Sequence, residues 1–306
     1  MATTPVLATA ACSNTSPNLS QSTQDANLQA KPQKLENFGV QLSTLTPLML
    51  KDFAGTLAAV AAIGYKQIEF SAMGFLGRSP QRITQLLDEH NLQAPVGRVT
   101  PALPDNFFSL PQSEARRVYM QKSGPENFIN NIKYALDNAL ALDQAFLNIP
   151  AIPKSQFASL DELNATIESI NQGAEICAAQ GVLLGYHNHD WELKAIDGVI
   201  PLEAMLQQTT ADKVGFQIDA YWIVKGGGNL DYYLQTYPGR FPSCHLKDID
   251  DNGDFADVGS GNIDFAAFIR GALANGCQHF FVERDGPPQP LQSVTRSYQY
   301  LAGLTF

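Results

Sequence analysis

The chain alternates short apolar runs with longer segments in which apolar residues recur every three or four positions. The runs are typical of buried parallel strands, and the longer segments of amphipathic helices. Strands are predicted at residues 38–43, 67–70, 95–99, 145–149, 182–186, 214–218, 241–244 and 280–282. Helices are predicted at 52–63, from Ser79-Pro80 onward, 128–142, from the capping box at 159–162 onward, 201–209, 229–236, 264–274 and 289–302. This alternation predicts parallel strands with right-handed crossovers, and eight units favour a closed (β/α)8 TIM barrel over an open doubly wound sheet.

The first 34 residues do not follow this pattern. They are rich in Ala, Ser, Thr, Asn and Gln and lack apolar periodicity, so we predict a disordered tail at 1–34 and the barrel at 35–306. Residues 7–14 resemble the end of a bacterial lipoprotein signal with Cys12 as the lipidated residue, although no basic segment precedes them. An Ala-rich tail without a signal fits the same residues. The first interpretation implies a periplasmic or lipid-anchored protein, and the second a cytoplasmic one.

Residues 100–124 are predicted to form a long loop, the largest insertion in the repeat. The segment follows the third strand, so it should emerge at the carboxyl ends of the strands. Loops of this length without regular structure are uncommon and often functional. We therefore interpret it as a candidate lid, with Phe107, Phe108 and Tyr119 as apolar cover.

Composition narrows the class of protein. The 306 residues carry a formal charge of −10, which would repel a phosphate backbone and disfavours nucleic-acid binding. The hydrophobic content of 44% is ordinary for a globular protein. No apolar run approaches the roughly 18 residues that a membrane-spanning helix needs. Membrane association would therefore depend on the lipid anchor at Cys12, and the sequence leaves the oligomeric state open.

Four side chains of metal-ligand type stand where successive strands are predicted to end: His187, Asp219, His245 and Glu283. In a (β/α)8 barrel the active site lies at the carboxyl ends of the strands, so these residues are predicted to meet there. Two imidazoles and two carboxylates suit Mn²⁺, Co²⁺ or Zn²⁺ better than Mg²⁺ or Ca²⁺. We therefore predict one divalent metal ion bound by the four residues.

Residues next to these ligands are candidates for proton transfer. His189 shares a side of the strand with His187 and could meet the substrate, while Glu192, further along the loop, could be a second acid or base. Lys247 lies two residues beyond His245 and could hold an oxyanion.

Three further residues are candidates for substrate contact. Trp222 follows Asp219 and could form the floor of a sugar site. Asp248 could orient a ligand histidine or contact the substrate. Glu69 ends the second strand and could line the pocket, although a structural ion pair explains it equally well.

At these residues the chain resembles the xylose isomerase-like TIM barrel superfamily, often called the sugar phosphate isomerase/epimerase family. The resemblance runs from Phe38 to about Leu301 and rests most specifically on the segments 186–192, 219–222, 245–248 and 282–283. It implies one divalent metal bound through Glu, Asp, His and Glu. By that pattern Asp219, His245 and Glu283 carry over, whereas His187 replaces the first Glu, as in inosose dehydratase-like members.

This departure puts the two-glutamate proton shuttle of ketose epimerases in doubt. It leaves Glu283, with Glu192, His189 or Lys247, as the acid and base candidates. The superfamily also contains endonuclease IV, but the acidic charge and the single four-residue ligand set argue against a nuclease.

Three functions remain. The first is a metal-dependent sugar isomerase or epimerase that works through an enediolate. The second is a lyase or dehydratase on a keto-sugar or 3-keto-glycoside, which His187 favours. The third is a non-catalytic sugar-binding protein, against which the acid and base candidates weigh. A small-molecule sugar is the expected partner in each.

Overall fold

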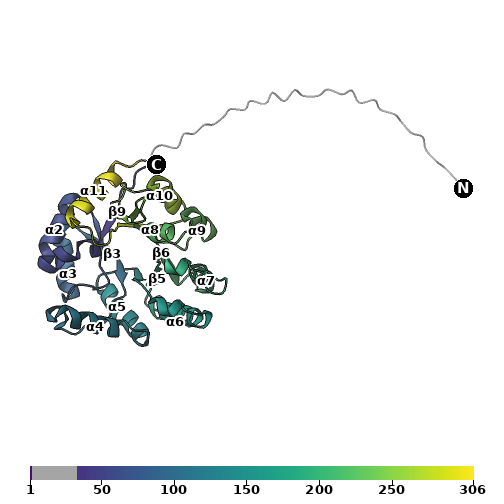
Figure 1. Ribbon diagram of the computed structural model, residues 1–306, viewed down its shortest axis with the longest axis horizontal. Coiled ribbons are helices and arrows are strands. Elements are labelled where there is room, and N and C mark those ends of the chain that lie inside the picture. Colours follow the sequence, from purple (N-terminus) through teal and green to yellow (C-terminus); the bar gives the residue numbers. More distant parts are fainter. Residues whose placement is uncertain (2–32) are drawn as a thin grey trace, which may run out of the picture. The chain divides into compact units, whose positions relative to one another are not determined.

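The computed structural model describes residue 1 and residues 33–306; the predictions for the tail and for Cys12 lie outside the described residues. Eight parallel strands close into a barrel with the order β1-β10-β7-β6-β5-β4-β3-β2 (Figure 1). The strands are β1 Gly39–Gln41, β2 Gln67–Glu69, β3 Gln93–Arg98, β4 Phe146–Ile149, β5 Leu183–His187, β6 Val214–Asp219, β7 Ser243–Leu246 and β10 His279–Val282. The last strand pairs with the first through Val40 and Val282, and this pairing closes the sheet. The predicted TIM barrel is confirmed.

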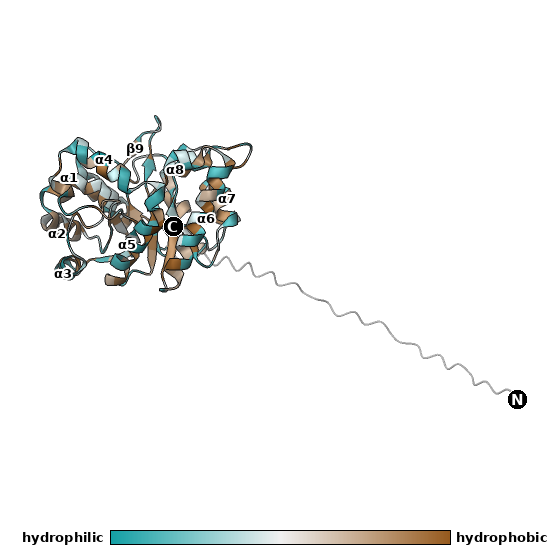
Figure 2. Cartoon of the chain, turned by 90° about the horizontal axis from the view of Figure 1, so that it is seen from below, coloured by the Kyte–Doolittle hydropathy of each residue, from teal (hydrophilic) through white to brown (hydrophobic). Residues whose placement is uncertain are grey.

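Helices surround the barrel and cover its apolar outer face (Figures 1 and 2). They are α1 Thr46–Lys51, α2 Phe53–Ile63, α3 Pro80–His90, α4 Gln112–Lys122, α5 Phe128–Ala141, α6 Leu160–Ala178, α7 Pro201–Gln208, α8 Ala220–Lys225, α9 Leu230–Thr236, α10 Phe265–Ala274 and α11 Pro290–Gly303. Short 3₁₀ turns are η1 Leu42–Leu45, η2 Phe107–Ser109, η3 Pro125–Asn127, η4 Lys154–Phe157 and η5 Trp191–Leu193. No helix among the described residues is both long enough and apolar enough to span a membrane.

The helix starts follow the capping chemistry expected from the sequence. The Ser159 hydroxyl accepts the Glu162 backbone N–H at 3.3 Å and donates to the Glu162 carboxylate at 2.7 Å, a capping box that opens α6. Asp264 accepts the Ala267 N–H at 3.0 Å and opens α10. Both starts were predicted from these residues.

The segment 100–124 differs from its prediction. It is not a continuous loop, because η2 and the eleven-residue α4 occupy much of it. The Tyr119 hydroxyl on α4 donates to the Ala72 carbonyl at 3.2 Å, which ties the segment to the loop after β2. Phe108 lines a cavity of about 310 Å³ between these two segments and α5. The loop prediction is therefore wrong, and the lid role stays a prediction.

Two short elements beyond strands six and seven were not predicted. Helix α8 begins directly after Asp219, whose carboxylate accepts the Trp222 N–H at 3.1 Å. Strands β8 Asp248–Ile249 and β9 Phe255–Ala256 form a hairpin at the carboxyl end of β7. Figure 2 shows α8, α4 and β9 toward the same end of the barrel.

The barrel interior changes from apolar to polar along its axis. At one level Val96, Phe146 and Phe281 pack together inside the sheet; we call these three residues the barrel plug. Glycine makes this packing possible, because a Cβ on Gly185 would collide with the Phe146 ring. Inward-facing positions nearer the carboxyl ends carry polar side chains, so the interior presents its chemistry at that end.

Candidate metal centre and active site

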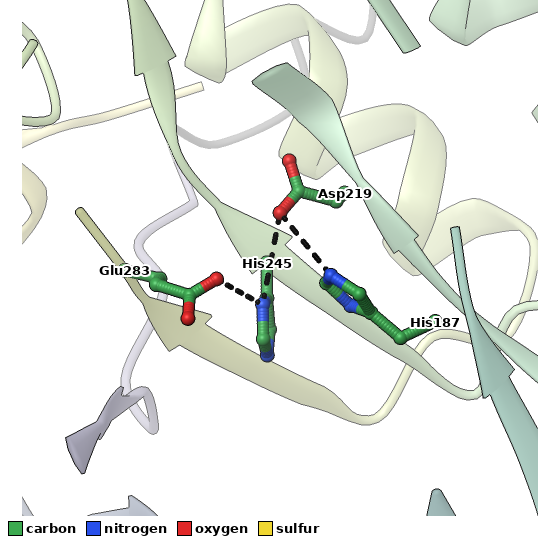
Figure 3. Close-up of side chains that lie close together, drawn as sticks. All are labelled: His187, Asp219, His245 and Glu283. Atoms are coloured by element: carbon green, nitrogen blue, oxygen red, sulfur yellow. Dashed lines mark hydrogen bonds and ion pairs between the residues drawn. The ribbon is translucent and has the colours of Figure 1, made fainter. Parts of the chain in front are cut away.

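The four predicted ligands lie together at the carboxyl ends of β5, β6, β7 and β10 (Figure 3). One ligand atom from each of the four lies within 4.8 Å of all the others, and all four side chains are buried. Asp219 Oδ2 is 3.7 Å from both His187 Nε2 and His245 Nδ1, and Glu283 Oε2 is 2.8 Å from His245 Nδ1. Asp219 Oδ2 makes no hydrogen bond with the described residues. An unpaired buried carboxylate oxygen facing two imidazoles is the arrangement expected of a metal site, so the residues fit a divalent ion.

Hydrogen bonds from below orient both imidazoles. His187 Nδ1 is 3.0 Å from Gln217 Oε1, and His245 Nε2 is 2.6 Å from Glu69 Oε2. An acceptor at one ring nitrogen holds a proton there and leaves the other nitrogen free to bind a metal. With a metal bound, His187 Nε2 and His245 Nδ1 would be the ligand atoms, and each lies 3.7 Å from Asp219 Oδ2.

The two histidines are held in different protonation states. Burial holds the pKa of His187 well below its ordinary value, and nearby His245 adds to this effect. Burial also lowers the pKa of His245, but Glu69 and Glu283 more than offset it and raise the pKa well above the ordinary value. Without a metal, His187 is thus neutral and His245 is an imidazolium. A metal ion that binds His245 must displace a proton, so acid should weaken binding.

Gln217 connects the ligands to a polar layer beneath them. Its Oε1 accepts from Arg98 at 3.0 Å and from Asn148 at 2.7 Å. Its Nε2 donates to Glu69 at 2.8 Å and to Ser243 at 2.9 Å. These four partners lie on β2, β3, β4 and β7, and Gln217 itself lies on β6. One amide therefore connects the side chains of five strands beneath the four-residue cluster.

We expect Gln217→Leu to weaken metal affinity about 10- to 100-fold, because His187 Nδ1 would lose the acceptor that fixes its ring. Titration of the metal-free protein with Zn²⁺ against a competing chelator measures this. Ser243→Ala is the matched control, because its hydroxyl bonds to Gln217 and not to a ligand. Equal affinities in wild type and Gln217→Leu would contradict a positioning role.

Lys247 lies beside the ligands and is almost fully buried. Its Nζ is 2.9 Å from Asp285 Oδ2, 3.1 Å from Glu283 Oε2 and 3.8 Å from Asp219 Oδ2. Burial lowers the pKa of Lys247, but Glu283, Asp219 and Asp285 outweigh it and raise the pKa above its ordinary value. The ammonium therefore stays charged and acts as a hydrogen-bond donor rather than a base.

Glu283 is positioned by both of its oxygens. Oε2 faces His245 and Lys247, while Oε1 accepts from the Ser43 hydroxyl at 2.6 Å. Burial raises the pKa of Glu283, but Lys247 and His245 more than offset this and hold it well below its ordinary value. The carboxylate is thus ionised. Its Oε2 belongs to the four-residue cluster, and its Oε1 lies outside the cluster beside Ser43.

Glu192 does not face the cluster. It is fully buried, accepts from the Tyr186 hydroxyl and accepts the His189 backbone N–H at 2.8 Å. Burial raises its pKa to about 7, although these hydrogen bonds counteract the rise. The structure therefore places this candidate acid beneath the loop after β5.

The pKa of Glu192 has a consequence for stability. The ordinary pKa of this carboxyl is 4.5, and its pKa in the folded protein is about 7. The contribution of Glu192 to the unfolding free energy is therefore fully present below pH 4.5 and is lost as pH rises to about 7. In metal-free protein, we expect the unfolding free energy of wild type relative to Glu192→Gln to fall by up to about 3 kcal/mol over that window. Denaturant titrations across this window measure it. Parallel curves would show that Glu192 stays ionised throughout.

Asp248 and Glu69 lie in different surroundings. Asp248 accepts backbone N–H groups of Gly259, Gly261 and Ile263 at 2.8–3.2 Å and contacts neither histidine ligand, so it fixes the loop before α10. Glu69 is buried, lies 3.3 Å from Arg98 and bonds to His245, so it is an ion-pair residue that also orients a ligand.

Aromatic rings extend outward from the ligands. The His189 ring lies 5.0 Å from that of His187 and 5.3 Å from that of Trp222. Lys247 Nζ lies 5.3 Å from the Trp222 ring centre. Trp222 therefore borders the site, at the start of α8.

Sequence reasoning missed Gln217, Arg98, Ser43 and Asp285. Gln217 carried a signal: it lies two residues before Asp219 on a strand, so it faces the same way, and it is polar within an apolar run. Arg98 ends β3 in the same manner. Ser43 was predicted to end the first strand but lies in the 3₁₀ turn η1, and Asp285 lies in an irregular segment, so strand spacing gave the direction of neither side chain.

Comparisons with known proteins agree with the fold. A family model described as xylose isomerase-like TIM barrel matches residues 57–302. A solved sugar phosphate isomerase/epimerase from Parabacteroides distasonis ATCC 8503 is 25% identical, with 92% of this chain and 98% of that chain covered and a TM-score of 0.72. A second such structure from the same organism is 24% identical, with 88% and 98% covered and a TM-score of 0.74.

The 3-keto-D-glucoside 4-epimerase from E. coli is 17% identical, with 87% of this chain and 98% of that chain covered and a TM-score of 0.62. At such identity, this likeness and that of the second Parabacteroides structure show the fold alone. No match was found among the curated proteins.

Proposed function

Because the chain belongs to the xylose isomerase-like TIM barrel family, we propose that it is a divalent-metal-dependent sugar isomerase or epimerase that works through an enediolate. The observation that carries the proposal is the buried cluster of His187, Asp219, His245 and Glu283, in which an Asp219 oxygen without a hydrogen bond faces one nitrogen of each imidazole. The mixed nitrogen and oxygen donors favour Mn²⁺, Co²⁺ or Zn²⁺.

A bound ion would polarise the hydroxyl and carbonyl oxygens of a hydroxy-carbonyl sugar. It would thereby acidify the C–H hydrogen on the carbon next to the carbonyl. The residues supply the rest. Glu283 is ionised and keeps Oε1 outside the ligand cluster, so it can accept that hydrogen as a proton. Lys247 is charged and buried, so it can donate to the oxygen that becomes negative. Ser43 holds the Glu283 carboxylate in place.

A lyase acting on a keto-sugar or 3-keto-glycoside is the second candidate, and the position of Glu192 favours it. Epimerisation by two bases needs a second carboxylate across the substrate, and Glu192 is turned away to Tyr186 and the His189 N–H. Elimination needs one base and an acid for the leaving group. Glu283 can be the base. Burial and the nearby Lys247 lower the pKa of His189 to about 3, so the donor to the leaving group would be the charged Lys247.

Incubation with sugars in D₂O separates the two reactions. The metal-loaded protein is screened by NMR against aldoses, ketoses and 3-keto-glycosides. An isomerase or epimerase incorporates deuterium into a rearranged sugar of otherwise unchanged composition, whereas a lyase releases water or an aglycone. Absence of exchange, rearrangement and elimination across the screen would contradict both.

A further inference from the structure

The loops after β7 and β10 form the side of the rim that adjoins Lys247 and Glu283. These two strands are the seventh and eighth of the barrel in chain order. In TIM barrels the loops after the seventh and eighth strands frequently bind a phosphate group of the substrate. Backbone N–H groups and arginine side chains are the groups that bind phosphate best, and both kinds are present in this part of the chain.

The backbone N–H groups of the loop after β7 are bound by a carboxylate of the chain itself. Asp248 Oδ2 accepts from Gly259 at 2.9 Å and from Gly261 at 2.8 Å, and Oδ1 accepts from Ile263 at 3.2 Å. A Cβ on Gly261 would collide with this carboxylate, so the loop is wrapped closely around it. Because Asp248 is fully buried, its carboxylate occupies the place in which converging N–H groups could hold a phosphate.

The two arginines on this side are occupied in the same way. Arg284 Nη1 lies 2.6 Å from Asp257 Oδ1, and Arg296 Nη2 lies 2.5 Å from Asp257 Oδ2. The Ser293 hydroxyl also donates to Asp257, which is buried. A second internal carboxylate thus stands between two guanidinium groups, where a phosphate would otherwise fit.

Asp285 places a third carboxylate where a substrate would arrive. Its side chain is 42% exposed, whereas the side chains of the four-residue cluster are at most 7% exposed. Asp285 Oδ2 lies 2.9 Å from Lys247 Nζ, its single ion pair within residues 33–306. Lys247 Nζ in turn lies 3.1 Å from Glu283 Oε2. Asp285 therefore reaches both the solvent and the immediate neighbour of the cluster.

The cations nearer the cluster are also paired. Lys247 is engaged by Glu283 and Asp285, and Arg98 lies 3.3 Å from Glu69. A phosphate on this side of the rim would meet the exposed Asp285 carboxylate without an unpaired cation to offset the repulsion. A hydroxyl group, by contrast, can donate a hydrogen bond to that carboxylate.

We infer that this side of the rim selects a sugar without a phosphate group, and that Asp285 is the specificity-determining residue. Its carboxylate accepts a hydrogen bond from a hydroxyl of the sugar and repels a phosphate in the same place. The inference rests on the proposed function and adds a substrate class to it, the unphosphorylated sugars.

Binding of sugars and of their phosphate esters tests this selection. D-Glucose, D-fructose and D-ribulose are compared by calorimetry with D-glucose 6-phosphate, D-fructose 6-phosphate and D-ribulose 5-phosphate, on the metal-loaded protein. We expect at least one free sugar to bind about tenfold tighter than its ester, the scale of the repulsion between a carboxylate and a doubly charged phosphate a few ångströms apart in water. Inorganic phosphate, titrated into the metal-free protein at millimolar concentration, should not bind.

Two variants separate charge from hydrogen bonding. Asp285→Asn keeps an acceptor oxygen and loses the charge, so it should strengthen binding of the ester roughly three- to tenfold and leave the free sugar unchanged. Asp285→Ala also loses the acceptor, so it should weaken the free sugar roughly three- to tenfold. Asp212→Asn is the matched control, because it removes the same charge from an exposed residue before β6, at the amino ends of the strands.

Four results would overturn the inference: an ester that binds as tightly as its free sugar, inorganic phosphate that binds the metal-free protein, no binding of any of the three free sugars, or an Asp285→Asn variant whose preference matches that of Asp212→Asn. Binding is read without turnover, so the two proposals fail separately. Preference for a free sugar while no sugar reacts would contradict the enzymatic proposal alone. Turnover of a phosphate ester in preference to its free sugar would contradict the selection alone.

Discussion

Lys247→Met is expected to lower turnover by roughly 10²–10³-fold, the loss typical when one donor to a developing oxyanion is removed. The Lys247 ammonium is buried among Glu283, Asp285 and Asp219, and methionine fills similar space without the charge. Metal content should stay near that of wild type, because Lys247 cannot ligate while it is protonated. Deuterium exchange into a responsive sugar and elemental analysis measure the two quantities.

Lys225→Met is the matched control, since Lys225 bonds to the exposed Gly253 carbonyl and lies outside the ligand set. This control should retain full turnover. Were Lys247→Met to remain fully active, the oxyanion role would pass to His189 or to the metal alone.

Purified, metal-loaded protein is expected to hold about one first-row divalent ion per chain. Asp219→Asn should lose most of it, because the unpaired, charged Oδ2 is replaced while Oδ1 can still cap α8. At a metal concentration 100 times its dissociation constant, binding stabilises the fold by about 2.7 kcal/mol. Wild type should thus melt about 5 °C higher with metal than after chelation, and Asp219→Asn should show little difference.

Elemental analysis and paired melting curves measure these effects. Asp251→Ala, which removes an exposed carboxylate from the turn between β8 and β9, should behave as wild type. A loaded wild-type protein without stoichiometric metal would contradict the assignment of the centre.

That His187, Asp219, His245 and Glu283 lie together could be predicted from sequence, because this follows from the topology of the barrel. Each of the four lies at the carboxyl end of a strand or within one residue of it, and parallel strands of a barrel end at one rim. The contacts of the residues around this cluster could not be predicted, because the directions of their side chains are set by turns and loops without a regular spacing. The turn after β5 directs the carboxylate of Glu192 to Tyr186, and its role as an acid stays a prediction. Asp248 looked like a partner for histidine, but four backbone N–H groups of its own hairpin and the following loop bind it.

The segment 100–124 was mispredicted for a different reason. Helix α4 buries none of its residues fully and is strongly polar, so it lacks the apolar stripe that marks a helix in sequence. Its contacts, such as Tyr119 with Ala72, join it to another loop rather than to the barrel core. Local pattern could not reveal an element stabilised in this way.

The barrel plug of Val96, Phe146 and Phe281 also limits the directions from which a molecule can reach the four-residue cluster. It closes the interior beneath the polar layer, so the described part of the barrel offers a ligand no passage through its base. A substrate would therefore approach the four-residue cluster from the carboxyl ends of the strands, the end at which Trp222 lies beside Lys247.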